Sequence, residues 1–151
     1  MLGPLLVALA IVSICVFIHV LGMLLLFRYL MTKREVLKEE PSFSRSFTIL
    51  MSSFGVIIML HMFEASIWAL FYYMRELFAD FETSFYYSLT CYTTMGFGDV
   101  VLPRSWRLLG GLEGISGVLL CGLSTAFLFL IISALIEMHH EEQAAKKKPA
   151  E

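Results

Sequence analysis

Residues 90–99 lie between two long apolar segments and read Thr-Cys-Tyr-Thr-Thr-Met-Gly-Phe-Gly-Asp. Within this stretch Thr94 is followed by glycines at alternate positions, Gly96 and Gly98. The pattern predicts a short extended strand whose carbonyls all point to one side, because that geometry alternates between the two signs of φ and glycine adopts positive φ at little cost. Four such strands facing one another would form stacked rings of oxygen that replace the water around an unhydrated cation. One chain supplies one strand, so this chemistry requires a tetramer.

A second group of notable side chains lies inside the apolar segments, where ionisable residues are costly and by default suggest function. His61 and Glu64 are three residues apart and share one face of a helix, and Glu113 lies in the segment after the glycine stretch. Two interpretations stay open: a proton-sensitive cluster with His61 as the titrating group, or a buried polar clamp between helices. His19, in the first apolar segment, is predicted to form a helix–helix hydrogen bond rather than to bind a ligand.

The composition is that of a membrane protein. Hydrophobic residues make up 58% of the 151 residues, and the mean hydropathy is +0.78, well above globular averages. The net charge of -2 and the lack of a basic patch with interleaved aromatics argue against a nucleic-acid partner. No nucleophile or hydrolase motif accompanies His61 and Glu64, so we expect no enzyme activity, no catalytic residues and no organic cofactor.

The apolar segments also define the expected domains. Residues 1–30 are predicted to form an N-terminal transmembrane helix, because about 20 apolar residues cross a bilayer as a helix and no basic residue occurs early enough for a signal peptide. A cytoplasmic loop is expected at 31–45 and a cytoplasmic tail at 138–151. Between them lies a membrane domain at 46–137, divided as follows: a spanning helix at 46–75, a short helix at 80–93, the glycine stretch at 94–98 and a last spanning helix at 106–137.

Charge predicts the orientation of these segments. Five basic residues occur close together between the first two spans, and the tail carries three lysines, so both regions are expected in the cytoplasm. The five residues are Arg28, Lys33, Arg34, Lys38 and Arg45. The N-terminus and the glycine stretch are then expected outside, and the C-terminus in the cytoplasm.

The short helix has a predicted start and a predicted depth. Asp80 is a suitable N-cap and Glu82 falls in the first turn. A helix of about 13 residues reaches only about 20 Å. It can therefore enter the membrane and stop, which leaves the negative end of its dipole near the bilayer centre, where a cation would wait.

From about residue 47 to residue 137 the chain resembles the pore domain of the potassium channel superfamily. The resemblance depends on Thr93-Thr94 and Gly96-Phe97-Gly98-Asp99 occurring together with the flanking spans. It implies an all-α membrane protein: a homotetrameric pore of outer helix, pore helix, selectivity filter and inner helix, with one additional N-terminal helix. The chain is most similar to small prokaryotic potassium channels, which implies the plasma membrane, here the bacterial inner membrane, as its location.

The resemblance also assigns roles to individual residues. It implies that K+, the only metal expected, binds to the filter residues Thr94, Met95, Gly96, Phe97 and Gly98. Residues implied to support the filter are Tyr86, Tyr87, Thr90, Thr93 and Asp99. On the inner helix, Gly117 falls near the usual gating hinge and Gly122 at a second small position, although close helix packing is the alternative explanation for Gly117.

The implied function is passive, potassium-selective conduction. Phe97 stands where the family usually has tyrosine and Met95 where it often has valine, so a weakly selective monovalent cation channel is one alternative. A non-conducting accessory membrane subunit is another. The expected partners are three further copies of the chain and membrane lipid, and no soluble ligand-binding domain is expected in the chain.

Overall fold

The computed structural model describes residues 2–39 and 43–147, and over these residues the chain forms four helices. Their bounds are α1 Leu2–Glu39, α2 Phe43–Met74, α3 Phe81–Tyr92 and α4 Arg107–Lys147. The described residues contain no strand, so the expected all-α fold is confirmed.

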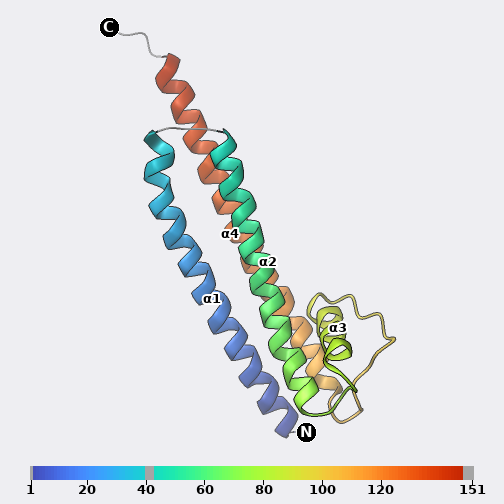
Figure 1. The fold of residues 1–151 in the computed structure, drawn as a ribbon. Helices are drawn as coiled ribbons and strands as arrows, with labels where there is room; N and C mark the ends of the chain where they lie inside the picture. The colour runs from blue at the N-terminus through green and yellow to red at the C-terminus, as the bar shows by residue number, and fades with distance from the viewer. Residues whose placement is uncertain (1, 40–42, 148–151) are drawn as a thin grey trace.

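The three long helices lie side by side, and short α3 packs at one end of them (Figure 1). The start of α1 lies at the same end as α3, whereas the end of α1, the start of α2 and the end of α4 lie at the opposite end. This arrangement places the glycine stretch near the start of α1, and it places the end of α1 near the end of α4.

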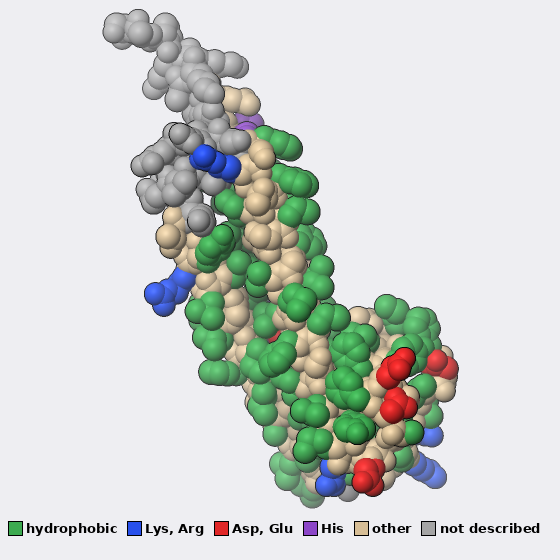
Figure 2. All heavy atoms as spheres, viewed as in Figure 1, with side chains coloured by type: hydrophobic (Ala, Val, Ile, Leu, Met, Phe, Trp, Pro, Cys, Tyr) green, Lys and Arg blue, Asp and Glu red, His purple; other side chains and the backbone are tan. Residues whose placement is uncertain are grey.

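Three of the described helices are long and apolar enough to cross a membrane: Leu2–Thr32, Phe43–Met74 and Arg107–His140. Hydrophobic side chains cover the visible face of these helices along their length, and acidic side chains gather at the end that holds α3 (Figure 2). Such an apolar exterior fits a lipid environment rather than water. The chain is therefore a membrane protein with three candidate spans.

Helix ends differ from the sequence-based ranges at two places. The loop expected at 31–45 is helical up to Glu39 and again from Phe43, and Pro41 falls outside the described residues. The tail expected at 138–151 is helical up to Lys147. The first segment is rich in Lys, Arg and Glu and the second in Lys, Glu and Ala, residues that favour helix in water as well as in lipid. The predicted spans ended where the sequence becomes polar, but the helices continue through these polar residues.

Local chemistry explains the short helix. The Asp80 carboxylate accepts a hydrogen bond of 2.7 Å from the Thr83 backbone N–H, which confirms Asp80 as the N-cap. At the other end the helix stops at Tyr92, and Thr94 has a positive φ of 60° that cannot continue a right-handed helix. Twelve residues correspond to about 18 Å.

The main core lies at the α3 end of the molecule. It combines Trp68 and Tyr72 of α2 with Tyr87 of α3, Leu109 of α4 and small residues of α1, among them Ala8. Every helix contributes to this cluster, so α3 is held in a fixed position against α2 and α4.

Candidate functional site

The glycine stretch follows α3 directly and has the backbone alternation that its sequence predicts. Gly96 and Gly98 have φ values of 54° and 79°, and Thr94 has 60°. Positive φ at Thr94 was not expected, because a β-branched residue rarely adopts it. The Thr94 N–H donates to the Cys91 carbonyl at 2.9 Å and the Gly96 N–H donates to the Thr90 carbonyl at 3.0 Å. These two bonds hold the unusual turn against the end of α3.

The side chains of this stretch are exposed in the single chain. Met95 is 61% exposed and Phe97 is 65% exposed. Such large exposed apolar side chains, in a stretch directly after a packed helix, indicate a surface that another molecule covers.

Of the two tyrosines expected to support the filter, Tyr86 contacts the residue that follows the glycine stretch. The Tyr86 hydroxyl donates to the Asp99 carboxylate at 2.7 Å, which joins α3 to the residue just after Gly98. This bond raises the pKa of Tyr86. Tyr87 instead enters the core against Tyr72 and Phe78, because neighbouring residues on a helix point about 100° apart. The structure therefore brings Tyr86 and Asp99 together and leaves Tyr87 apart from them.

The two threonines at the end of α3 use their hydroxyls within the helix. Thr90 donates to the Tyr87 carbonyl at 2.8 Å, and Thr93 donates to the Leu89 carbonyl at 2.6 Å. The Thr90 carbonyl accepts a hydrogen bond from the Gly96 N–H in the glycine stretch. The main chain, rather than the side chain, makes the contact.

The glycines of α4 fall into two kinds. A Cβ atom at Gly117 would overlap the Tyr92 carbonyl oxygen and lie 2.9 Å from the carbonyl carbon. A Cβ at Gly122 would meet nothing within 4 Å. Helix α4 runs continuously through both positions. The geometry at Gly117 thus favours close packing of α4 on the end of α3, which was the alternative to a hinge.

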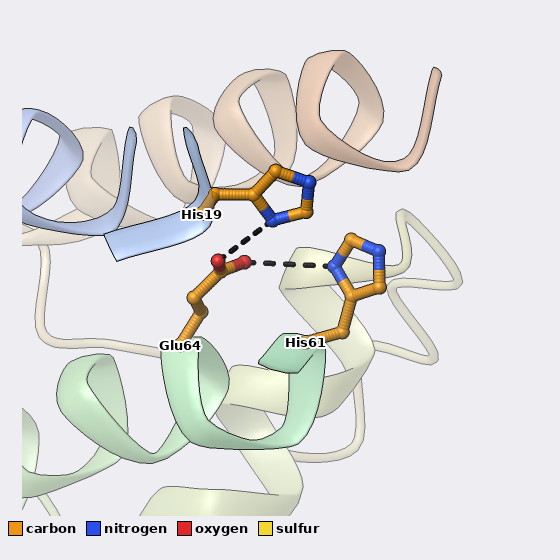
Figure 3. Close-up of side chains that lie close together, drawn as sticks. All are labelled: His19, His61 and Glu64. Atoms are coloured by element: carbon orange, nitrogen blue, oxygen red, sulfur yellow. Dashed lines mark hydrogen bonds and ion pairs between the residues drawn. The ribbon is translucent and has the colours of Figure 1, made fainter. Parts of the chain in front are cut away.

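His61 and Glu64 belong to a polar network that joins all four helices, here called the buried ring: Glu64, His19, Ser124, His61 and Tyr92. His19 Nδ1 lies 2.8 Å from Glu64 Oε1, and His61 Nδ1 lies 3.5 Å from Glu64 Oε2 (Figure 3). The Tyr92 hydroxyl is hydrogen-bonded to Glu64 Oε2 and lies 2.8 Å from His61 Nδ1. Ser124 Oγ lies 3.0 Å from His61 Nε2 and 3.1 Å from His19 Nε2.

The buried ring confirms the helix–helix hydrogen bond predicted for His19. Sequence reasoning missed Tyr92 and Ser124, which lie 28 and 63 positions from their partners Glu64 and His61. A tyrosine at the end of a helix and a serine in an apolar span are common residues, so no sequence signal marked them.

Glu113 is not a member of this network. It accepts from the Tyr72 hydroxyl at 2.6 Å and from the Ser88 hydroxyl, and it is fully buried. Tyr72 stands eight residues after Glu64 on α2, a rise of about 12 Å. The expected cluster of His61, Glu64 and Glu113 is therefore corrected to two separate networks, which meet α3 one turn apart, at Tyr92 and at Ser88.

Comparison with known proteins places this arrangement in a family. Residues 60–134, from the second half of α2 to the middle of α4, match the family described as ion channel. The matched region, 75 of the 151 residues, belongs to the potassium channel pore-domain family. This pore domain includes α3, the glycine stretch and both networks except His19. It is an ion channel family and not an enzyme family.

One curated relative is similar to the pore domain. The potassium voltage-gated channel protein Shal of Drosophila melanogaster is 31% identical over 75 residues, which are 49% of this chain and 13% of that protein. The chain thus spans about an eighth of the length of this relative. No solved structure matches.

Proposed function

We propose that the chain is a potassium-selective channel that conducts passively as a homotetramer. The observation that carries the proposal is the positive φ at Thr94, Gly96 and Gly98, at alternate positions in the stretch between α3 and α4. Alternation of this kind lets successive carbonyls point to the same side, as carbonyl rings that replace ion hydration require. The stretch falls within the residues matched to the ion channel family, and the similar relative is a potassium channel by name.

Within this proposal the filter residues bind K+ through the main chain. Thr94 supplies a hydroxyl and a carbonyl to the innermost site, and Met95, Gly96 and Phe97 supply carbonyls to successive rings. Gly98 closes the outer end. Because the main chain makes the contacts, the unusual side chains Met95 and Phe97 do not enter the ion path.

Exposed surfaces support assembly with further copies. Beside the glycine stretch lies a hollow of about 470 Å³, lined by the end of α3 and by Gly111, Gly114, Ile115 and Leu119 of α4. Ile115 is 60% exposed and Leu119 68% exposed. Apolar side chains from a neighbouring copy would fill this hollow, and four copies would enclose the filter.

The dipole of α3 adds to the attraction for a cation. Its C-terminus at Tyr92 carries partial negative charge, equivalent to about half an elementary charge. In a tetramer four such ends would point toward the space below the filter. Inner helix α4 would line that space.

We further propose that the N-terminus and the filter face the outside of a bacterial inner membrane. The basic end of α1 and the end of α4 lie together at one end of the molecule, as this orientation needs.

Reversal potentials test the proposal. The full chain is purified, reconstituted in liposomes fused to a planar bilayer, and measured with K+ on one side and Na+ on the other. A reversal potential near the K+ equilibrium value supports selectivity, and a value near zero supports the weakly selective channel instead. Absence of any current supports the accessory-subunit alternative.

A matched pair of glycine variants ties the current to the filter. Gly96→Ala places a side chain at positive φ, which costs roughly 1–2 kcal/mol for each of four copies. Gly55→Ala introduces the same methyl group into α2, where a Cβ meets nothing within 4 Å. We expect K+ selectivity to be lost in Gly96→Ala and kept in Gly55→Ala. Equal selectivity in both would refute the assignment of the filter.

A further inference from the structure

The five hydrogen bonds of the buried ring require five hydrogens, and this requirement determines the charge of the ring. The ring closes through the contacts Glu64–His19, His19–Ser124, Ser124–His61, His61–Tyr92 and Tyr92–Glu64. Each contact needs one hydrogen between its two heavy atoms. Tyr92 and Ser124 supply one hydrogen each, and each neutral histidine supplies one more. The fifth hydrogen must be an acid proton, held either by Glu64 or as the second proton of a histidine.

The count does not depend on histidine tautomers. If every bond donates in one sense around the ring, Tyr92 donates to Glu64 and Glu64 donates to His19. If every bond donates in the opposite sense, His19 donates to Glu64 and Glu64 donates to Tyr92. Both senses, and the ion-pair forms between them, contain the same five hydrogens.

Burial makes the protonated ring the low-energy form. His19 and Glu64 have no exposed surface, Tyr92 is 2% exposed and Ser124 is 3% exposed. With its acid proton the ring has no net charge, whereas without it the ring carries one negative charge inside an apolar bundle, which is costly. The described contacts pair Glu64 with histidines and a tyrosine only.

Among the residues that the structure describes, the titratable groups acting on the ring offer no positive charge. The other titratable groups that act on the ring are Cys15 of α1 and Cys121 of α4, and Glu113 acts on Cys15 from its own network. All three are neutral or negative groups. None of them stabilises the one negative charge that the ring would carry without its proton, so they also favour retention of the proton.

We propose that the buried ring is a binding site for one exchangeable proton, and that this proton fixes the end of the pore helix. Tyr92 is the last residue of α3, and Gly117 of α4 packs on its carbonyl. When the proton leaves, two acceptors face each other without a hydrogen and the ring must open at that bond. His61 is the most accessible member, 13% exposed, and is the entry point for the proton.

A metal ion fits the same atoms less well. The ligand atoms of His19, His61 and Glu64 lie within 4.8 Å of one another. His19 Nδ1 and Glu64 Oε1 are 2.8 Å apart, a hydrogen-bond distance, whereas two ligands about 2.0–2.1 Å from one tetrahedral zinc ion would be about 3.4 Å apart. His61 Nδ1 already lies 2.8 Å from the Tyr92 hydroxyl.

The proposal predicts the pH dependence of folding. In the unfolded chain the two ring histidines together hold about one proton near pH 6.5, and none above about pH 7.5. The folded ring holds one. Above about pH 6.5 the folded state therefore binds more protons, so the folding constant falls as pH rises, approaching tenfold per pH unit until the ring releases its proton.

Glu64→Gln is the decisive variant. The glutamine amide supplies the fifth hydrogen permanently, so the ring can close without an acid proton. His140→Gln is the control, because it removes an exposed histidine far from the ring near the end of α4. Tyr92→Phe is a second variant. It opens the ring and leaves three bonds, which three hydrogens satisfy without an acid proton.

The experiment measures unfolding of the full chain in detergent micelles at several pH values. From about pH 7.5 to about pH 9.5 we expect the folding constants of wild type and His140→Gln to fall relative to Glu64→Gln, by up to about tenfold per pH unit. If the folding constants of wild type and Glu64→Gln change in parallel with pH, the proposal is overturned. If Glu64→Gln does not fold, the same comparison is made with Tyr92→Phe, and parallel curves again overturn the proposal. Parallel curves together with stabilisation by Zn²⁺ that requires Glu64 would assign the site to a metal instead.

The effect on conduction rests on the proposed channel function and is measured separately. Over the same pH range we expect K+ flux into liposomes to decline for wild type and to stay constant for Glu64→Gln. Loss of the pH-dependent difference in stability would refute the proton site. A normal difference in stability with no flux in any variant would refute the channel and leave the proton site standing.

Discussion

The contact between Gly117 and Tyr92 gives a prediction that separates packing from hinge motion. Gly117→Ala adds a methyl carbon 2.9 Å from the Tyr92 carbonyl carbon and 3.1 Å from its ring. Carbon atoms pack at about 3.5–4.0 Å, and the carbonyl oxygen is closer still, so α3 and α4 must separate by about 1 Å. Forced overpacking of this kind costs about 1–3 kcal/mol.

The control for this prediction is Gly122→Ala on the same helix. Both substitutions gain about 0.5–1 kcal/mol from replacing a mid-helix glycine, but a Cβ at Gly122 meets nothing within 4 Å. The propensity gain cancels in the comparison. We therefore expect Gly117→Ala to be less stable than Gly122→Ala by about 1–3 kcal/mol.

Denaturant unfolding in micelles measures this difference, and K+ current in bilayers measures its functional effect. If Gly117→Ala is as stable as Gly122→Ala, the two helices do not touch as described. If both variants are stable but both slow channel opening, the glycines act as hinges, and the packing explanation fails.

Two further predictions concern polar contacts of α3 and its neighbours. Tyr72→Phe removes one of the two hydroxyl donors to buried Glu113, so we expect a loss of about 1–3 kcal/mol in the free energy of unfolding; Tyr73→Phe, at an exposed tyrosine, is the control and should be neutral. Hydrogen bonds from Thr83 lower the pKa of Asp80, so its capping contribution is present at neutral pH and is lost as pH falls through that lowered pKa. Asp80→Ala should therefore lower the melting temperature at pH 7 but not in strong acid, whereas Asp80→Asn should keep the cap and lose the acid sensitivity; a melting temperature that is unchanged in Asp80→Ala at pH 7 would contradict the cap.

Local signals made much of this fold predictable. The apolar segments, the Asp80 cap and the glycine alternation each depend on residues close together in the chain, and each is found in the structure. The same signals failed at the ends of the predicted helices, where polar residues that favour helix continue α1 to Glu39 and α4 to Lys147.

Side-chain partners were predictable only within one helix turn. His61 and Glu64 could be paired by their spacing, but Glu113 was joined to them only because all three are ionisable. Its real partners Tyr72 and Ser88 come from two other helices, and which residues meet there depends on how α2, α3 and α4 pack. The positive φ of Thr94 was missed for a similar reason, since bonds to the end of α3 hold it.

The match to known channels begins at residue 60, after α1. Buried Glu64 lies within the matched region, but one of its hydrogen-bond partners lies outside that region. His19 of α1 is the partner of Glu64 Oε1 and also of Ser124. A chain trimmed to the matched residues would leave Glu64 Oε1 in its interior without its hydrogen-bond partner, at a cost of about 1–3 kcal/mol. The first helix is in this sense a structural part of the domain that follows it. Grafting this pore onto a different membrane anchor would require either a donor at the same depth or an apolar residue in place of Glu64.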